Sequence, residues 1–214
     1  MQTSSTARPS RSDRYAARVA LTNFFAAHKD LAAVASPAPR VWWHSPLTLN
    51  DVKRILWAAL RETLAALGQE ARPLPQYAEV AEWLADNQGR GLLLCGTCGQ
   101  GKTILGRYVL PRLLLEMHRK IVHPVDAQAM NSQLSEMLNF HIISIDDIGT
   151  EPQSQFRNCA FADLVDRAEK KGGLMIITTN LNGEQLRERY GDRVLDRLRG
   201  LTRQVYFTGQ SFRE

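Results

Sequence analysis

The amino-acid sequence predicts an α/β fold, in which a parallel sheet of five strands carries helices on both faces. Three observations support this prediction. Short apolar runs alternate with stretches of helical spacing, the connections between them are short, and three of the apolar runs end in glycine or polar residues. Alternating strands and helices with short connections build a parallel sheet, and the polar residues then meet at its carboxyl edge, where ligands bind.

The first 75 residues precede the predicted sheet. Residues 1–14 are rich in Ser and Arg, which is typical of a disordered basic arm, although a transit peptide has a similar composition. Residues 15–35 form an Ala-rich helical pattern, and the pair Trp42-Trp43 indicates either core packing or a contact with a partner. We therefore expect a helical extension over residues 15–75 and the main domain over residues 76–214.

Two more helices are expected before the sheet. Thr48 and Asp51 have the spacing of a capping box, and apolar residues continue at helical spacing until Gly68, which suits a C-terminal stop. A shorter helix is expected around residues 77–84. These helices either pack on the main domain or present a surface to a partner protein.

A glycine-rich loop follows the first expected core strand, residues 91–95. The loop fits the pattern G-x-x-x-x-G-K-[ST] and consists of Gly96, Thr97, Cys98, Gly99, Gln100, Gly101, Lys102 and Thr103, followed by Ile104. Its glycines allow successive N–H groups to wrap a phosphate chain at the start of a helix. Lys102 would reach the β- and γ-phosphates, and Thr103 would hold Mg²⁺. We therefore expect residues 96–104 to bind a nucleotide.

The loop opens a helix over residues 104–110, which Pro111 is expected to end or kink. A strand over residues 120–125 and one short helix over residues 134–140 are expected next. The order of strand, glycine loop and helix is the one that phosphate binding requires.

A second motif is an apolar strand over residues 142–145 that ends in Asp146 and Asp147. Phosphoryl transfer needs an acid near Mg²⁺ and a group that orients the attacking water. Asp146 suits the metal together with Thr103. Asp147 suits the water, although many nucleotide hydrolases carry the longer glutamate there.

A third motif follows a helix expected over residues 154–171. The strand over residues 173–179 ends at Asn180. At the carboxyl edge of the sheet, Asn180 could hydrogen-bond the water or the γ-phosphate, or it could cap the next helix.

The fourth motif is the arginine-rich segment over residues 190–200, which precedes a last strand over residues 204–207. Arg193 and Arg197 are four residues apart and share one helix face. An arginine that reaches the γ-phosphate of a neighbouring subunit stabilises charge in the transition state. A solvated helix surface is the alternative interpretation.

These motifs, in this order, resemble the DnaC-type helicase loaders and the IstB-type transposition ATPases, which belong to the initiator branch of the AAA+ superfamily. The resemblance covers about residues 76–208 and is carried by the loop, by the Ile-Asp-Asp and Thr-Thr-Asn segments, and by Gly-Asp-Arg-Val-Leu-Asp-Arg-Leu. It implies a P-loop NTPase of the AAA+ type, with a five-stranded sheet in the order 5-1-4-3-2.

The resemblance also implies catalytic roles that correspond to named motifs of the superfamily. These are Walker A (Lys102 and Thr103), Walker B (Asp146 and Asp147), sensor 1 (Asn180) and box VII (Arg193 and Arg197). Of the two box VII arginines, Arg197 is expected to be the finger that acts on the ATP of a neighbouring subunit, and Arg193 to support it.

The chain departs from the family pattern in two places. Only one short helix fits between residues 125 and 142, where the relatives carry a longer helical insertion that lines a DNA-binding spiral, so their DNA contacts are not carried over. The chain also stops at Glu214 without a C-terminal helical lid, so we expect no sensor 2 arginine, as in the loader and IstB-type relatives.

The composition favours contact with phosphates and no membrane span. The formal net charge is +5, and the sequence pI is about 9.3. There is no apolar stretch of about 18 residues, and the N-terminus lacks the apolar core of a signal peptide. Cys95 and Cys98 have metal-ligand spacing, but no second pair follows and Cys159 is alone, so we expect packing roles and no disulfide. A cytoplasmic location is expected.

The sequence therefore predicts an ATPase that binds ATP and Mg²⁺, associates with copies of itself and remodels a nucleoprotein complex of replication. The expected partner of a loader is a replicative helicase. The IstB-like alternative would act with a transposase on duplex DNA, and single-stranded DNA also stays open as a partner. A small-molecule P-loop kinase and a nucleotide-gated scaffold without hydrolysis are the alternatives from other classes.

Overall fold

The computed structural model describes residues 40–152 and 160–208, which belong to one compact unit. The expected basic arm, the helix over residues 15–35 and Cys159 lie outside the described residues. No helix in the described part of the chain is long and apolar enough to cross a membrane.

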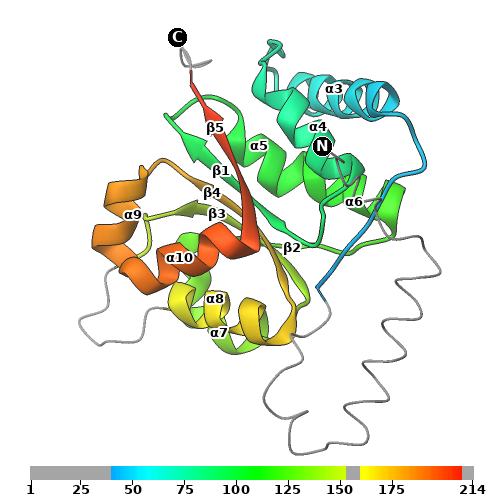
Figure 1. Ribbon diagram of the computed structural model, residues 1–214. Coiled ribbons are helices and arrows are strands. Elements are labelled where there is room, and N and C mark those ends of the chain that lie inside the picture. Colours follow the sequence, from blue (N-terminus) through cyan, green and yellow to red (C-terminus); the bar gives the residue numbers. More distant parts are fainter. Residues whose placement is uncertain (1–39, 153–159, 209–214) are drawn as a thin grey trace, which may run out of the picture. The chain divides into compact units, whose positions relative to one another are not determined.

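The core of this unit is a five-stranded parallel sheet (Figure 1). Its strands are β1 (Gly91–Gly96), β2 (His123–Asp126), β3 (Ile142–Ile148), β4 (Leu174–Thr179) and β5 (Thr202–Phe207). Every neighbouring pair is parallel, and the order across the sheet is β2-β3-β4-β1-β5. The structure therefore confirms the α/β fold and the strand order that the resemblance implies, and it brings the ends of all five strands to one edge.

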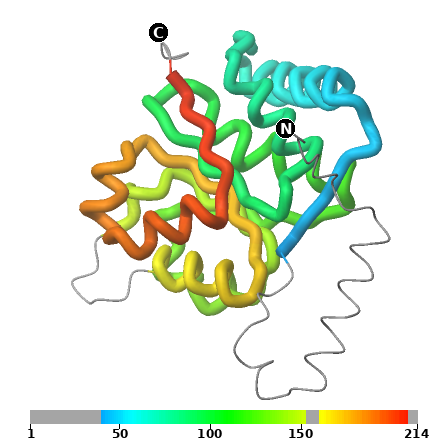
Figure 2. Tube along the Cα trace, viewed as in Figure 1, coloured from blue at the N-terminus to red at the C-terminus, as the bar shows by residue number. Residues whose placement is uncertain are grey.

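Helices cover both faces of the sheet (Figures 1 and 2). The first face carries α3 (Leu49–Ala66), α4 (Gln76–Ala85) and a continuous stretch made of α5 (Lys102–Ile104), the π-helical η1 (Leu105–Val109) and α6 (Leu110–His118). The second face carries the 3₁₀ turn η2 (Ala127–Ala129), α7 (Met130–Met137), α8 (Ala160–Lys171), α9 (Gly183–Tyr190) and α10 (Asp192–Leu201).

Strand β1 lies inside the sheet and is buried on both sides. Leu92 and Leu94 point into the apolar cluster of the first face, and Leu93 and Cys95 point into the cluster of the second. Side chains alternate in this way because a strand has a period of two. A strand covered on both faces therefore needs an unbroken apolar run, which explains the sequence signal at residues 91–95.

Helix α3 is held by caps at both ends. The hydroxyl oxygen of Thr48 accepts a hydrogen bond from the Asp51 N–H at 3.2 Å and donates to the Asp51 carboxylate at 2.6 Å. At the other end Gly68 has φ +70°, and the N–H groups of Gly68 and Gln69 donate to the carbonyls of Ala65 and Leu64. This pair of bonds is a Schellman motif, which requires a left-handed residue and explains the glycine.

The apolar stripe of α3 packs into the same cluster as β1 and α4. Its buried residues are Val52, Leu56, Ala59, Leu60 and Leu64. Full burial of one such aliphatic side chain stabilises a fold by about 1.5–3 kcal/mol. Helix α3 is thus part of the core of the described unit, and the expected boundary near residue 75 stays a prediction.

The two neighbouring tryptophans have different environments. Trp43 is buried, meets Trp83 edge to face at 5.0 Å between ring centroids, and donates from Nε1 to the Leu84 carbonyl at 3.0 Å. Trp42 is 55% exposed and donates from Nε1 to the Asp86 carboxylate at 3.2 Å. Core packing therefore explains Trp43 alone.

The expected helix over residues 134–140 is wrong in its bounds. Helix α7 begins at Met130, directly after η2, because the Asp126 carboxylate accepts from the Gln128 N–H at 2.9 Å and starts the turn. It ends at Met137, and the following Phe140 stacks on His123 with ring centroids 3.6 Å apart.

Of the two expected effects of Pro111, ending or kinking the helix, the structure contradicts the first. Pro111 does not end the helix that follows the loop, because a π-helical turn precedes the proline and the helix continues to His118. Arg193 and Arg197 both lie on α10, as expected. Gly191, with φ +84°, separates α9 from α10, and its left-handed conformation breaks the helical path.

Candidate functional site

The glycine-rich loop connects the end of β1 to α5. Gly96, Gly99 and Gly101 have φ values of +135°, +80° and +79°, which side chains other than glycine rarely allow. A Cβ atom on Gly96 would lie 2.0 Å from the Phe207 carbonyl oxygen of β5. These glycines let the chain turn sharply from the sheet edge into a helix N-terminus, which is the local structure that binds a phosphate chain.

A pocket of about 240 Å³ lies against this loop. Four parts of the chain contribute: the end of α3, the loop with α5, the end of β3 and the end of β4. The lining residues are Leu64, Gln69, Cys98, Gly99, Gln100, Gly101, Lys102, Thr103, Ile104, Asp147, Thr178 and Asn180. The carboxyl edge of the sheet therefore brings the loop, Asp147 and Asn180 into one pocket, whereas Asp146 is not among the lining residues.

Lys102 is the most constrained charge in the pocket, with 6% of the residue exposed. Its Nζ donates to the carbonyls of Gly96 at 2.9 Å and Thr97 at 2.7 Å, and to Asn180 Oδ1 at 2.9 Å. Burial lowers the pKa of Lys102, and the nearby Cys98 and Asp147 oppose this shift. The ammonium group is thus held at the base of the loop by three oxygen atoms.

The two carboxylates of β3 lie at an irregularity of the sheet. The pairing of β3 with β4 shifts register between Ile145 and Ile148, which places Asp146 and Asp147 in a bulge. Asp147 has φ +60°, a left-handed conformation that is uncommon outside glycine. Bulges of this kind aim a side chain at a site.

Asp147 faces the pocket and is partly buried. Its carboxylate accepts a hydrogen bond from Asn180 Nδ2 at 2.8 Å. Burial raises the pKa of Asp147, and the neighbouring Asp146 raises it further, while Lys102 opposes both effects. Asp147 is therefore a more basic carboxylate than an ordinary aspartate.

Asn180 joins the two charged residues of the site. Its Oδ1 accepts from Lys102, and its Nδ2 donates to Asp147. The helix that follows is capped by Asn182, whose side chain accepts from the Gln185 N–H. The capping alternative for Asn180 is thus excluded for α9, and its amide lies in the pocket.

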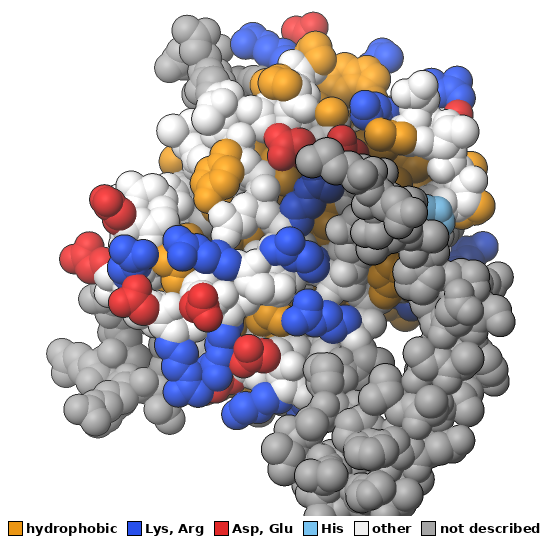
Figure 3. Space-filling view, viewed as in Figure 1, with side chains coloured by type: hydrophobic (Ala, Val, Ile, Leu, Met, Phe, Trp, Pro, Cys, Tyr) orange, Lys and Arg blue, Asp and Glu red, His pale blue; other side chains and the backbone are white. Residues whose placement is uncertain are grey.

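The two arginines of α10 are not among the residues that line the pocket. Arg197 pairs with Asp166 of α8 and, at 2.7 Å, with Glu169, whereas Arg193 lies 3.7 Å from Asp166. The Arg197 side chain is 16% exposed and that of Arg193 is 74% exposed. Figure 3 shows basic and acidic side chains interspersed over α9 and α10. Within one chain, both arginines contact α8 instead of the loop.

Sequence reasoning missed three residues of the site. Thr178 stands two positions before Asn180, so the period of a strand could have placed both on one side. Leu64 lies in α3 and Gln69 just after it, about thirty residues before the loop, and no local signal links that helix to the pocket. Only the tertiary packing of α3 brings them there.

The cysteines do not form a metal site in the described part of the chain. Cys95 is buried in β1, and burial raises the pKa of its thiol to about 11. Cys98 is exposed and lines the pocket. Among the residues that the structure describes, no group of three or more His, Cys, Asp or Glu could hold a metal ion.

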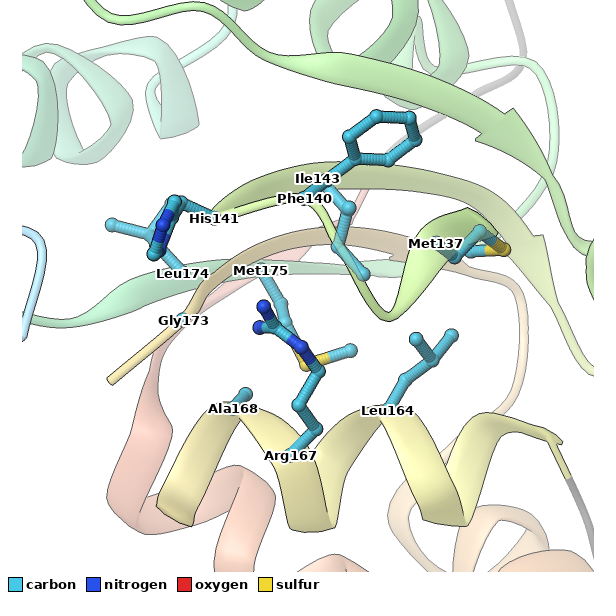
Figure 4. Close-up of a pocket in the computed structure, with 10 residues that line it drawn as sticks. All are labelled: Met137, Phe140, His141, Ile143, Leu164, Arg167, Ala168, Gly173, Leu174 and Met175. Carbon is cyan, nitrogen blue, oxygen red and sulfur yellow. The ribbon is translucent and has the colours of Figure 1, made fainter. Parts of the chain in front are cut away.

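A second cavity lies at the opposite end of the sheet, where β3 and β4 begin (Figure 4). Arg167 of α8 extends along it and donates from Nε to the Leu138 carbonyl, while the other lining side chains are mostly apolar. With a volume of about 10 Å³, it holds at most one water molecule. The pocket at the loop is the candidate site because the predicted phosphate-binding residues line it.

Known proteins resemble this chain in sequence and in fold. No family model matches the chain. A 143-residue region is 26% identical to the replicative helicase loader DnaC of Escherichia coli K12, and the same values hold for the DnaC of Shigella flexneri. The match covers 60% of this chain and 58% of the relatives, so the chain spans less than two thirds of their length.

Two solved structures share the fold. A crystal structure of the DnaC helicase loader gives a TM-score of 0.57 at 17% identity, over 72% of this chain and 98% of that one. A putative primosome component from Streptococcus pyogenes gives a TM-score of 0.54 at 18% identity, over 72% and 97% of the two chains. In sequence and in fold, the chain is thus similar to the DnaC-type helicase loaders of the AAA+ superfamily, as its ordered motifs predict.

Proposed function

We propose that this chain binds ATP with Mg²⁺ at the loop pocket, hydrolyses the ATP in an assembly of its own copies, and loads or remodels a replication nucleoprotein complex. One observation carries the proposal. Lys102, Asn180 and Asp147 form a continuous hydrogen-bonded chain beside a phosphate-binding loop, in a sequence similar to a replicative helicase loader.

The two ends of the pocket suggest how the nucleotide lies. Asp147 and Asn180 mark the end where the γ-phosphate and the attacking water would sit, because phosphoryl transfer needs acidic and amide groups there. Leu64 and Gln69 lie at the end of α3 and offer an apolar surface and an amide. That combination suits a nucleobase, so the nucleoside would lie toward α3.

The donor set fits Mg²⁺. One oxygen of Asp146 is held by the hydroxyl of Thr178, a residue that lines the pocket, at 2.6 Å, and Thr103 also lines the pocket. Mg²⁺ prefers hard oxygen ligands and usually takes one or two from the protein, with phosphate oxygens and waters as the rest. Asp146 and Thr103 would hold the ion, which would neutralise charge on the phosphates when bound.

The remaining groups would act on the phosphates and the water. Lys102 would exchange its carbonyl partners for β- and γ-phosphate oxygens. Asp147 would orient the attacking water and accept a proton from it, which its raised pKa favours. Asn180, already hydrogen-bonded to both side chains, would hold the water or the γ-phosphate between them.

The arginine that completes the site would come from a neighbouring copy. Within one chain, Arg197 contacts Asp166 and Glu169 and not the loop. We propose Arg197 as the finger, oriented by these two carboxylates, and the exposed Arg193 as its support. An arginine supplied by a neighbour stabilises transition-state charge and accelerates hydrolysis by about 10³–10⁵-fold.

Two substitutions test the proposed site. Lys102→Ala is expected to abolish nucleotide binding, because the phosphates lose their buried cation. Arg197→Ala is expected to keep nucleotide affinity and to lose turnover by about 10³-fold, because the finger acts in the transition state. Fluorescent-nucleotide binding and phosphate release measure the two effects, with Arg119→Ala as a control outside the pocket and α10. Equal loss of nucleotide affinity in both variants contradicts the finger role.

The partner is tested separately. The full chain, with ATP, is expected to co-purify with the replicative helicase of its host and to transfer it onto single-stranded DNA. A chain that hydrolyses ATP but neither binds the helicase nor affects its DNA loading contradicts the loader role and leaves the ATPase intact.

A further inference from the structure

Thr178 occupies a central place at the end of β4. It is 2% exposed, and its hydroxyl makes two hydrogen bonds with consecutive residues of β3. The hydroxyl donates to Asp146 Oδ1 at 2.6 Å, and its oxygen accepts from the backbone N–H of Asp147 at 2.8 Å. One side chain therefore contacts both carboxylate-bearing residues at once.

The bond to Asp147 compensates for the irregular pairing of the strands. Because β3 shifts register at this point, the Asp147 N–H has no regular backbone partner on β4. A buried N–H without a partner costs about 1–3 kcal/mol, so the Thr178 oxygen stabilises the left-handed conformation of Asp147. That conformation decides where the Asp147 carboxylate points.

The bond to Asp146 fixes one of its two oxygens. A hydroxyl can donate only one proton, so the other carboxylate oxygen stays available for a cation. A partner that hydrogen-bonds a metal-binding carboxylate orients it, and its loss typically costs 10–100-fold in metal affinity or activity.

The orientation of the Thr178 hydroxyl is itself determined by packing. A Cβ atom added to Gly106 of η1 would lie 2.8 Å from the Thr178 methyl carbon, so that methyl fills the space left by the glycine. A β-branched side chain has few rotamers, and with the methyl against η1 the hydroxyl faces β3. Contacts with β3 and η1 therefore fix the orientation of the Thr178 side chain on β4.

We infer that Thr178 is a positioning residue for ATP hydrolysis, which acts by orienting Asp146 toward the metal and by holding Asp147 in its left-handed conformation. The inference rests on the proposed function, because it concerns the same pocket. It adds a residue that positions both acids through a single hydroxyl.

Thr178→Val tests this role because valine keeps the branched shape and removes the hydroxyl. Turnover at saturating ATP is expected to fall by 10–100-fold, and the Mg²⁺ concentration for half-maximal turnover to rise. Nucleotide affinity measured without Mg²⁺ is expected to stay within about twofold, because Lys102 and the loop are unchanged. Thr178→Ser keeps the hydroxyl and is expected to retain most of the turnover.

Thr179→Val is the matched control. Thr179 is the next residue, is fully buried, and also makes two hydrogen bonds, donating to the Ile148 carbonyl at 2.7 Å and accepting from the Leu181 N–H at 3.1 Å. Neither partner is an acid. The two valine variants should lose similar stability, but only Thr178→Val should change the Mg²⁺ dependence.

The outcomes separate the inference from the proposed function. A wild-type chain without ATP turnover in any assembly contradicts the proposed function. If the wild type turns over ATP, two results overturn the inference. One is a Thr178→Val variant with the turnover and Mg²⁺ dependence of the wild type. The other is an equal loss of turnover in Thr178→Val and Thr179→Val. If Thr178→Val does not fold, Thr178→Ser and Thr178→Ala are compared, and an equal Mg²⁺ dependence in these two variants also overturns it.

Discussion

At the scale of single residues, the site contains a residue whose backbone conformation and partly buried charge both lower the stability of the fold. Asp147 adopts φ +60°, and its carboxylate is partly desolvated beside a second acid. Such features reduce stability, and they occur where contacts with the surrounding structure hold them in place. Here the hydrogen bond from Asn180 to the Asp147 carboxylate and the bond from the Asp147 N–H to Thr178 hold the residue in place.

The raised pKa of Asp147 leads to a prediction about stability. Because its pKa is higher in the folded chain than in the unfolded chain, the ionised carboxylate costs folding free energy at every pH above the folded value. The cost disappears as the pH falls below the ordinary pKa of an aspartate. Asp147→Asn, which has nearly the same shape and tolerates the left-handed conformation, is therefore expected to be more stable than wild type at pH 7 and to lose this advantage near pH 4.

Urea unfolding of the nucleotide-free chain at several pH values measures the difference. The same substitution is expected to reduce turnover by about 10²-fold or more, because the water loses its base. An Asp147→Asn variant that is less stable than wild type at pH 7 contradicts the electrostatic account of this residue.

At the scale of elements, the sequence predicts β1 and β4 best, whereas β2 begins three residues after its expected start and β3 continues three residues past its expected end. Strands β1 and β4 are apolar on both faces, and that pattern locates them within one or two residues. Helix α7 starts four residues before its expected position because Asp126 caps a turn that apolar spacing does not reveal. The π-helical turn before Pro111 also has no apolar signal, since it depends on how η1 packs against the sheet.

Gly106 shows why that packing matters. Its carbonyl accepts from the Ser144 hydroxyl at 2.7 Å, and an added Cβ would lie 2.8 Å from the Thr178 methyl. Gly106→Ala is therefore expected to destabilise the chain by about 1–3 kcal/mol through overpacking. The control is Gly200→Ala in α10, where an added Cβ meets nothing within 4 Å. It is expected to stabilise the chain by up to about 1 kcal/mol. Denaturant unfolding compares the two variants, and equal effects contradict the close approach of η1 to β4.

At the scale of the whole molecule, the alternating pattern predicts the fold and the family resemblance implies the strand order, whereas two long-range relations could not be predicted. The ion pairs of Arg197 with α8 join residues about thirty apart, and the pocket contacts of α3 join segments about as distant. Apolar periodicity predicts which face of α3 is buried, but it does not predict that the C-terminal end of α3 reaches the glycine-rich loop. These relations depend on tertiary packing, which a local pattern does not contain.

The position of α3 leads to a prediction about the unit as a whole. Because Leu60 is fully buried in the cluster that also contains β1, Leu60→Ala is expected to destabilise the entire described unit by about 2–5 kcal/mol. Thermal unfolding monitored in α3 and in the sheet should then show one shifted transition. Two separate transitions, with the sheet unchanged, contradict the integration of α3 into the core. Leu67→Ala, at the exposed residue that caps the C-terminus of α3, is the control.

The measurement that most directly tests the shared ATPase site is complementation between two inactive variants. Asp147→Asn lacks the water-orienting acid and keeps Arg197, whereas Arg197→Ala keeps the whole pocket and lacks the finger. Each variant alone is expected to be nearly inactive. In an equimolar mixture, about one quarter of the interfaces would combine an intact pocket with an intact arginine, so turnover should recover to about that fraction of the wild-type rate. If wild type hydrolyses ATP and both variants bind it in mixed assemblies, a mixture that stays inactive contradicts the account.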